Sequence, residues 1–136
     1  MNTKRLLWAT IAVLIVIGVV GYVVHHVLLS DIYKQTASVW RPEADMKQML
    51  ATMWIGHLIY ALMFVFIYTR GIEKRKNKIE QGVRYGIYVT LLVCVPGSIM
   101  WYVILPIPGM LAVYWSLAGL VESVIAGMAV ASIYKA

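Results

Sequence analysis

Four long runs of apolar residues, separated by short polar segments, constrain this chain more than any other feature. They cover residues 6–29, 50–68, 85–105 and 110–134. A bilayer core of about 30 Å needs roughly 20 apolar residues in a helix that rises about 1.5 Å per residue. Each run is continuous and much longer than the alternating tracts of about ten residues that form membrane barrels. The sequence therefore predicts an all-α protein, a bundle of four transmembrane helices in a single membrane domain.

The composition supports a lipid-embedded chain. Of the 136 residues, 62% are apolar and 13% are charged, whereas roughly a quarter of the residues of a soluble domain are charged. The formal net charge of +6 would favour a nucleic-acid partner only if the cations lay on one soluble surface. They lie instead at particular ends of the apolar runs, so we expect a lipid bilayer as the partner and no nucleic acid.

The placement of the cations predicts the orientation. Lys4 and Arg5 precede the first run, and residues 30–49 carry balanced charges. The segment 69–84 is strongly basic, with Arg70, Lys74, Arg75, Lys76, Lys78 and Arg84. Positive residues gather on the cytoplasmic side of membrane proteins. Both termini and the basic loop are thus predicted to be cytoplasmic and residues 30–49 to lie outside. The basic loop could also bind anionic lipid headgroups, although the topology rule alone accounts for it.

Prolines and glycines mark the connections. Pro106-Ile107-Pro108-Gly109 joins the third and fourth runs, and so short a link predicts a tight antiparallel hairpin. Pro96-Gly97 should kink the third helix, because proline lacks an N–H donor. Arg41-Pro42-Glu43 is typical of a helix start. The single cysteine, Cys94, excludes an intrachain disulfide and a CxxC motif.

Several of these motifs together resemble a known family. The stretch Gln81-Gly82-Val83-Arg84-Tyr85-Gly86, then Pro96, Trp101-Tyr102 and the turn at 106–109, resembles uncharacterised small four-span bacterial inner-membrane proteins. The likeness extends back through Arg41-Pro42-Glu43 and His57, and so covers most of the chain. The resemblance implies a location in the bacterial inner membrane and no particular activity.

Glu122 is the acidic residue inside a predicted span, near the middle of the fourth run. A charged side chain at that depth is costly, so we expect it to face the bundle interior and to be neutral unless a cation pairs with it. One interpretation is a proton or cation site. The other is a neutral acid that hydrogen-bonds to Tyr60, Thr90 or Ser98 and stabilises the packing.

Two histidines could bind a metal near the outer face. His25 and His57 lie at similar depths in the first and second runs, and Met49 and Met53 share a helical face with His57. Thioether and imidazole ligands suit copper(I), and two histidines on facing helices suit a haem. Methionine is also an ordinary filler of apolar gaps, and a buried histidine usually finds a hydrogen-bond partner.

Small residues recur at helical spacing and predict close helix contacts. They are Gly18 and Gly21 in the first run, Gly82 and Gly86 at the start of the third helix, and Gly119, Ser123 and Gly127 in the fourth. The chain contains no nucleotide motif and no paired nucleophile and base. We therefore expect a non-enzymatic accessory or assembly subunit, which packs with itself or with a larger membrane complex. The alternatives are a proton-coupled transporter that uses Glu122, and a haem or copper protein.

Overall fold

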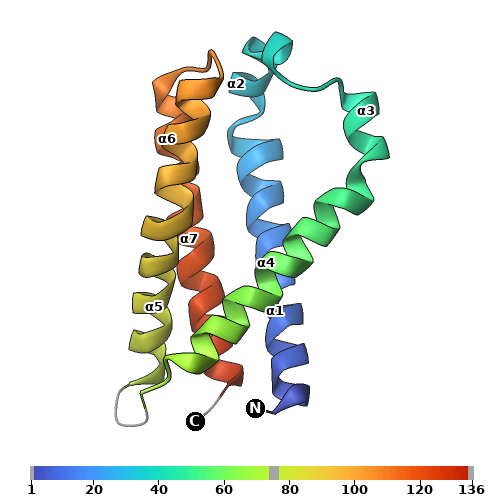
Figure 1. Cartoon of the computed structure of the whole chain (residues 1–136). Coiled ribbons are helices and arrows are strands. Elements are labelled where there is room, and N and C mark those ends of the chain that lie inside the picture. Colours follow the sequence, from blue (N-terminus) through green and yellow to red (C-terminus); the bar gives the residue numbers. More distant parts are fainter. Residues whose placement is uncertain (1, 74–76, 135–136) are drawn as a thin grey trace.

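The computed structural model describes residues 2–73 and 77–134, and within these ranges it contains helices and no strand. In chain order the elements are α1 (Thr3–Tyr22), η1 (Val23–Leu28), α2 (Ser30–Gln35), η2 (Ala37–Val39), α3 (Glu43–Gln48), α4 (Leu50–Arg70), α5 (Lys78–Val89), η3 (Thr90–Cys94), α6 (Val95–Ile104) and α7 (Gly109–Ile133). Figure 1 shows them as an elongated bundle. The predicted all-α class is confirmed.

Four helical segments among the described residues are long and apolar enough to cross a membrane. They are Thr3–Leu28, Leu50–Arg70, Lys78–Ile104 and Gly109–Ile133. Each corresponds to one of the apolar runs in the sequence. The chain is therefore compatible with a small integral membrane protein that crosses a bilayer four times.

Both described ends of the chain lie at one end of the bundle, together with the connection between α4 and α5 (Figure 1). We call this the terminal end, and the opposite end, which carries α2 and α3, the α2–α3 end. At the terminal end the backbone N–H of Asn2 donates a hydrogen bond of 3.0 Å to the Tyr134 hydroxyl. The two ends of the chain are thus joined directly.

Two of the long helices contain a π-helical segment. In α1 the helix continues into η1, where the N–H of Leu29 bonds to the carbonyl of Val24 over 2.9 Å. The second, η3, ends at Cys94, just before Pro96. Because Pro96 has no N–H to donate, the widened turn before it lets the helix pass the proline without a regular bond there.

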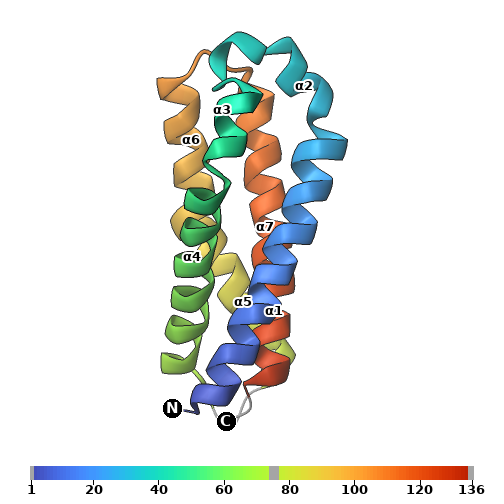
Figure 2. The same cartoon turned by 90° about the vertical axis from the view of Figure 1, so that its right-hand side faces the viewer.

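The apolar core lies in the half of the bundle near the terminal end. It is built from α1, α4 and α7, with Val13, Val65 and Val130 fully buried. Helix α7 packs between α1 and α5, whereas α4 packs mainly against α1. Towards the α2–α3 end α4 diverges from α1 in both views (Figures 1 and 2). The bundle is therefore tight at one end and splayed at the other.

A second, smaller core closes the α2–α3 end around the turn between α6 and α7. Leu29, Ile107 and Leu111 are buried there, and α2 packs over them. The sequence signal at Pro42-Glu43 does mark a helix start, since α3 begins at Glu43. A break at Met49 separates α3 from α4, so the second span does not simply extend outward.

Helix α5 begins at Lys78, whereas the third span is expected to start at residue 85. The earlier start has a local cause, because the Asn77 side chain caps the helix by accepting hydrogen bonds from the N–H groups of Ile79 and Glu80. Part of the predicted basic loop is thus helical. Lys78 and Arg84 lie on α5, Arg70 ends α4, and Lys74, Arg75 and Lys76 lie outside the described residues.

Candidate functional site

A cleft of about 1030 Å³ opens in the α2–α3 half of the bundle. Its walls come from α1 and η1, from α2 and the segment that leads to α3, and from α6 and α7. Aromatic and apolar side chains line most of it, including Tyr33, Trp40, Trp101 and Trp115. Glu122 of α7 lines the same cleft. The splayed helices therefore leave a space that reaches the intramembrane acid.

Glu122 is half-buried, and its carboxyl group makes no hydrogen bond or ion pair with any described residue. None of the partners proposed from the sequence is hydrogen-bonded to it in the described structure. Thr90 donates a 2.9 Å hydrogen bond to the Gly86 carbonyl, and no hydrogen bond joins Tyr60 or Ser98 to Glu122 in the described structure. The carboxyl group is thus available to form a hydrogen bond or an ion pair with a ligand in the cleft.

Ser123, the next residue on α7, is buried, and its hydroxyl oxygen has no hydrogen-bond partner among the described residues. Tyr60 of α4 and Cys94 of η3 lie near it. Two adjacent residues of α7, Glu122 and Ser123, therefore place polar groups at one level of the bundle, beside the Tyr60 hydroxyl and the Cys94 thiol. A buried polar group without a hydrogen bond lowers the stability of a protein by about 1–3 kcal/mol. We therefore take Glu122 and Ser123 as the centre of the candidate site.

A chain of two hydrogen bonds connects the first and last spans at the mouth of the cleft. The Trp115 indole N–H donates to the Tyr33 hydroxyl over 2.7 Å, and that hydroxyl lies 2.6 Å from Nδ1 of His25. An indole can only donate. The Tyr33 hydroxyl, having accepted that bond, still has its own proton to donate, so it can donate to Nδ1 of a His25 tautomer that carries its hydrogen on Nε2.

Tyr33 and Trp40 complete this corner through ring contacts. The ring of Trp40 lies edge-on to Tyr33, with centroids 5.5 Å apart, and edge-on to Trp115, with centroids 6.0 Å apart. Burial raises the pKa of Tyr33 although its hydrogen bond with Trp115 lowers it. The phenol therefore stays neutral throughout the physiological range, and the aromatic corner carries no charge of its own.

The residues predicted to bind a metal have separate surroundings. His57 meets the edge of the Trp54 ring, with centroids 5.4 Å apart, and its Nδ1 is buried without a hydrogen-bond partner. Met49 and Met53 are exposed. No hydrogen bond or ring contact joins His25 to His57, and the described residues contain no group of three His, Cys, Asp or Glu placed to hold a metal ion. The haem or copper hypothesis stays a prediction.

The small residues of α5 and α7 lie at the contact between these two helices. A Cβ atom on Gly82 would come within 2.5 Å of the Gly127 carbonyl oxygen, and one on Gly86 would meet the Ser123 backbone. A Cβ on Gly119 would lie 2.6 Å from the Cβ of Cys94. Gly82, Gly86 and Gly127 therefore bring the backbones of α5 and α7 together inside the chain, and Gly119 leaves room for the Cys94 side chain of η3.

In α1, by contrast, neither glycine is needed for a close approach of two backbones. A Cβ on Gly18 would make an ordinary 3.6 Å contact with Trp54, and one on Gly21 would meet nothing within 4 Å. Gly21 lines the cleft. Its lack of a side chain enlarges that space and does not serve a helix contact.

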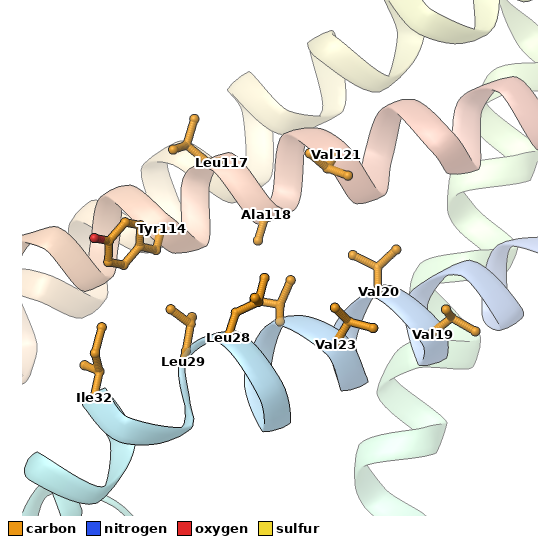
Figure 3. A pocket seen from close by; sticks show the side chains of 11 residues that line it. Val19, Val20, Val23, Leu28, Leu29, Ile32, Tyr114, Leu117, Ala118 and Val121 are labelled. Carbon is orange, nitrogen blue, oxygen red and sulfur yellow. The ribbon is translucent and has the colours of Figure 1, made fainter.

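A second groove of about 610 Å³ lies on the other side of the α1–α7 pair and is lined by apolar side chains and Tyr114 (Figure 3). Val20, Val24 and Ala118 line both spaces. They form the partition between the cleft and the groove. Val121 lines the groove, whereas Glu122 lines the cleft. Consecutive residues of α7 therefore line two different spaces.

Basic residues gather at the terminal end. Arg84 forms an ion pair with Glu73, and the Arg70 guanidinium lies 4.8 Å from the centre of the Phe66 ring. Lys4, Arg5 and Lys78 occupy the first turns of α1 and α5. These described cations lie at the terminal end, whereas Lys34, Arg41 and Lys47 belong to the segments at the α2–α3 end, and Lys34 and Arg41 line the cleft.

No protein family model, curated protein or solved structure matches this chain. The cleft and Glu122 are therefore the basis on which a function can be argued.

Proposed function

We propose that this protein is a small integral membrane protein that takes up a small solute into the cleft from the outer side of the membrane, with Glu122 as the group that exchanges a proton or pairs with the solute. One observation carries the proposal, namely that the single acid of the fourth span lines a cleft large enough for a ligand and forms no hydrogen bond or ion pair with the residues that the structure describes. Ionisable residues inside membranes commonly mark solute pathways.

The proposal includes an orientation, with both termini and the basic residues in the cytoplasm of a bacterium and the α2–α3 end outside. The cations near the termini support it. A phosphatase or fluorescent-protein reporter fused after Ala136 tests it. A cytoplasmic reporter signal agrees with the proposal, and a periplasmic signal contradicts it.

Accessibility of position 122 tests the cleft itself. In a Cys94→Ser background, Glu122→Cys should react with a charged, membrane-impermeant thiol reagent added from outside. Val121→Cys is the matched control, because it lies at the same depth on α7 but belongs to the apolar groove. Equal reaction rates at the two positions, or no reaction at position 122, would contradict the proposal that the cleft opens to the outer side.

Function in transport is tested in proteoliposomes. A proton gradient should drive accumulation of a solute by the wild-type protein, and Glu122→Gln should abolish it, because the amide cannot release a proton. Glu80→Gln removes the same charge from the first turn of α5 at the terminal end and should leave accumulation intact. Accumulation that survives Glu122→Gln would exclude this residue from the coupling.

A second candidate function is that of an accessory subunit, for which an exposed apolar face of α4 with a glycine on it is the candidate contact surface. Its residues near the α2–α3 end, such as Leu50, Ile55 and Ile59, are between 47% and 59% exposed. A Cβ on Gly56 would meet nothing within 4 Å. A small residue on an open apolar helix face permits another transmembrane helix to approach. We infer that α4 is the surface that another copy or a larger complex would use.

Cross-linking tests this second candidate. In a Cys94→Ser background, a cysteine at Ile55 should form an intermolecular disulfide under mild oxidation. Leu92 of η3, which is 78% exposed on a different helix, provides the control position. A monomeric mass in mild detergent together with no selective cross-link at Ile55 would count against the accessory role.

A further inference from the structure

We propose that the ligand of the cleft is an organic cation, a molecule with an aromatic or aliphatic body and one positive nitrogen that pairs with Glu122. This inference rests on the proposed function, because it names the class of solute that the same cleft would bind. Three features of the cleft carry it: the distribution of charge, the chemistry of the walls and the size of the space.

By the inner part of the cleft we mean the part beside Glu122, in the middle of α7; the charged residues Lys34, Arg41 and Glu43 line the cleft from the segments at the α2–α3 end. Lys34, at the mouth, forms an ion pair of 3.2 Å with Asp31. Glu43, also at the mouth, is paired with Lys47 over 2.8 Å. Arg41 is exposed to water, where salt screens its charge beyond about 10 Å. An anion in the inner part would meet Glu122 without compensation, whereas a cation would neutralise it.

The walls suit an apolar cation better than a hydrated one. Three tryptophans, Trp40, Trp101 and Trp115, line the space, and tryptophan gives the strongest cation–π attraction of the side chains. Along α7, Trp115 and Glu122 are separated by roughly 10 Å at about 1.5 Å per residue. A molecule with a single ring and a short linker could contact both levels.

A metal ion fits less well. Magnesium and calcium require about six oxygen ligands, and the described residues bring no cluster of acidic or imidazole ligands to this point. The volume of about 1030 Å³ is instead that of a site for a drug-sized molecule, which is typically about 300–1,000 Å³. The space is therefore larger than an inorganic ion needs.

A permanent cation and its carbon isostere test the charge requirement. Benzyltrimethylammonium and neopentylbenzene have nearly the same shape and differ in the charged nitrogen. Binding of each is measured by calorimetry with the protein in nanodiscs, and the heat of empty nanodiscs is subtracted. The cation should bind at least about 30-fold more tightly, the ratio expected when one member of a desolvated charge pair is missing. Equal affinities would overturn the inference.

Variants connect the binding to this cleft. Glu122→Gln should weaken benzyltrimethylammonium binding by about 30-fold or more, Glu122→Asp should retain most of it, and the control Glu80→Gln should not change it. Trp101→Leu should weaken binding by roughly 2- to 5-fold through the lost cation–π contact. Trp8→Leu removes a tryptophan near the terminal end that is 63% exposed, against 53% for Trp101, and should have no effect. If the affinity is unchanged in both Glu122→Gln and Trp101→Leu, the ligand does not bind in this cleft and the inference is wrong.

The outcomes separate the two proposals. If the two probes bind alike while a cysteine at position 122 reacts from outside, the cation class is wrong and the cleft remains. If the cysteine at position 122 does not react and neither probe binds, both the solute-binding function and the cation inference are wrong.

Discussion

The indole N–H of Trp115 donates a 2.7 Å hydrogen bond to the hydroxyl of Tyr33. This bond links the last span to α2, the short helix that follows the first span, across 82 positions of the chain. Because the same hydroxyl contacts His25, it fixes how α1, α2 and α7 meet at the mouth of the cleft. The shape of the candidate site therefore depends on one phenol that lies outside every span.

Replacing Tyr33 by Phe should destabilise the protein by about 1–3 kcal/mol, because it leaves the Trp115 N–H and the His25 Nδ1 without partners. The measurement is the free energy of unfolding in a dodecyl sulfate titration. Tyr114→Phe removes a hydroxyl from a half-exposed tyrosine of α7 that makes no hydrogen bond in the described structure and should change the free energy by less than about 0.5 kcal/mol. A loss of equal size in the control would show that the bond network is unimportant.

The tautomer of His25 provides a second test of the same network. Nitrogen-15 chemical shifts of labelled protein should show hydrogen on Nε2 and an acceptor at Nδ1, the tautomer to which the Tyr33 hydroxyl can donate while it accepts from Trp115. In Trp115→Phe the Tyr33 hydroxyl no longer accepts the indole bond, so the shift of Nδ1 should move. A hydrogen on Nδ1 of the wild-type protein would contradict the arrangement.

Gly86→Ala should destabilise the bundle by about 1–3 kcal/mol, because overpacking forces backbones apart. The added Cβ would lie 2.6 Å from the carbonyl carbon of Ser123, and a backbone cannot rotate away as a side chain can. Gly97→Ala lies in the same span, where a Cβ would meet nothing within 4 Å, and should stabilise the helix by up to about 1 kcal/mol. Thermal unfolding of both variants, compared with the wild type, measures the difference in sign.

Gln81→Leu should lower the free energy of unfolding by about 1–3 kcal/mol, because buried backbone groups then lose their hydrogen-bond partners. The Gln81 amide is 5% exposed and forms two hydrogen bonds of 2.8 Å with the backbone N–H and carbonyl of Glu73. Gln48→Leu, at an exposed position of α3, is the control. If the two variants unfold at the same dodecyl sulfate concentration, the Gln81 contact does not hold the connection between α4 and α5.

The Glu43–Lys47 pair predicts a pH effect in the outer segment. The hydrogen bond from Lys47, and then its charge, lower the pKa of Glu43. The folded-state pKa is thus below the unfolded one, so the contribution of this pair is present above the unfolded value and is lost as the pH falls through the folded value. Both side chains are exposed, so the effect on stability is small.

The titration itself is the better measurement. Carbon-13 shifts of the Glu43 carboxyl should give a midpoint below the ordinary glutamate value, and Lys47→Met should raise it. Lys34→Met removes a lysine that pairs with Asp31 instead and should leave the midpoint unchanged. A midpoint that does not respond to Lys47→Met would mean that the pair does not form in solution.

The sequence by itself determined the helical class and the number of spans, because burial of backbone polar groups in hydrocarbon leaves a continuous apolar run little choice but a helix. It also located the helix start at Glu43. It singled out Glu122, since an acid in such a run is conspicuous whatever surrounds it. These properties are local, so a window of about twenty residues contains the information.

Only the tertiary structure decided what surrounds those residues. Hydropathy is the same for every way of packing four apolar helices. It could not reveal that Gly86 contacts Ser123 within the chain or that α4 diverges from α1 (Figure 1). Nor could it reveal that α2 folds back and places Tyr33 between His25 and Trp115. The cleft follows from these long-range choices, because it is the space that the packed helices leave open.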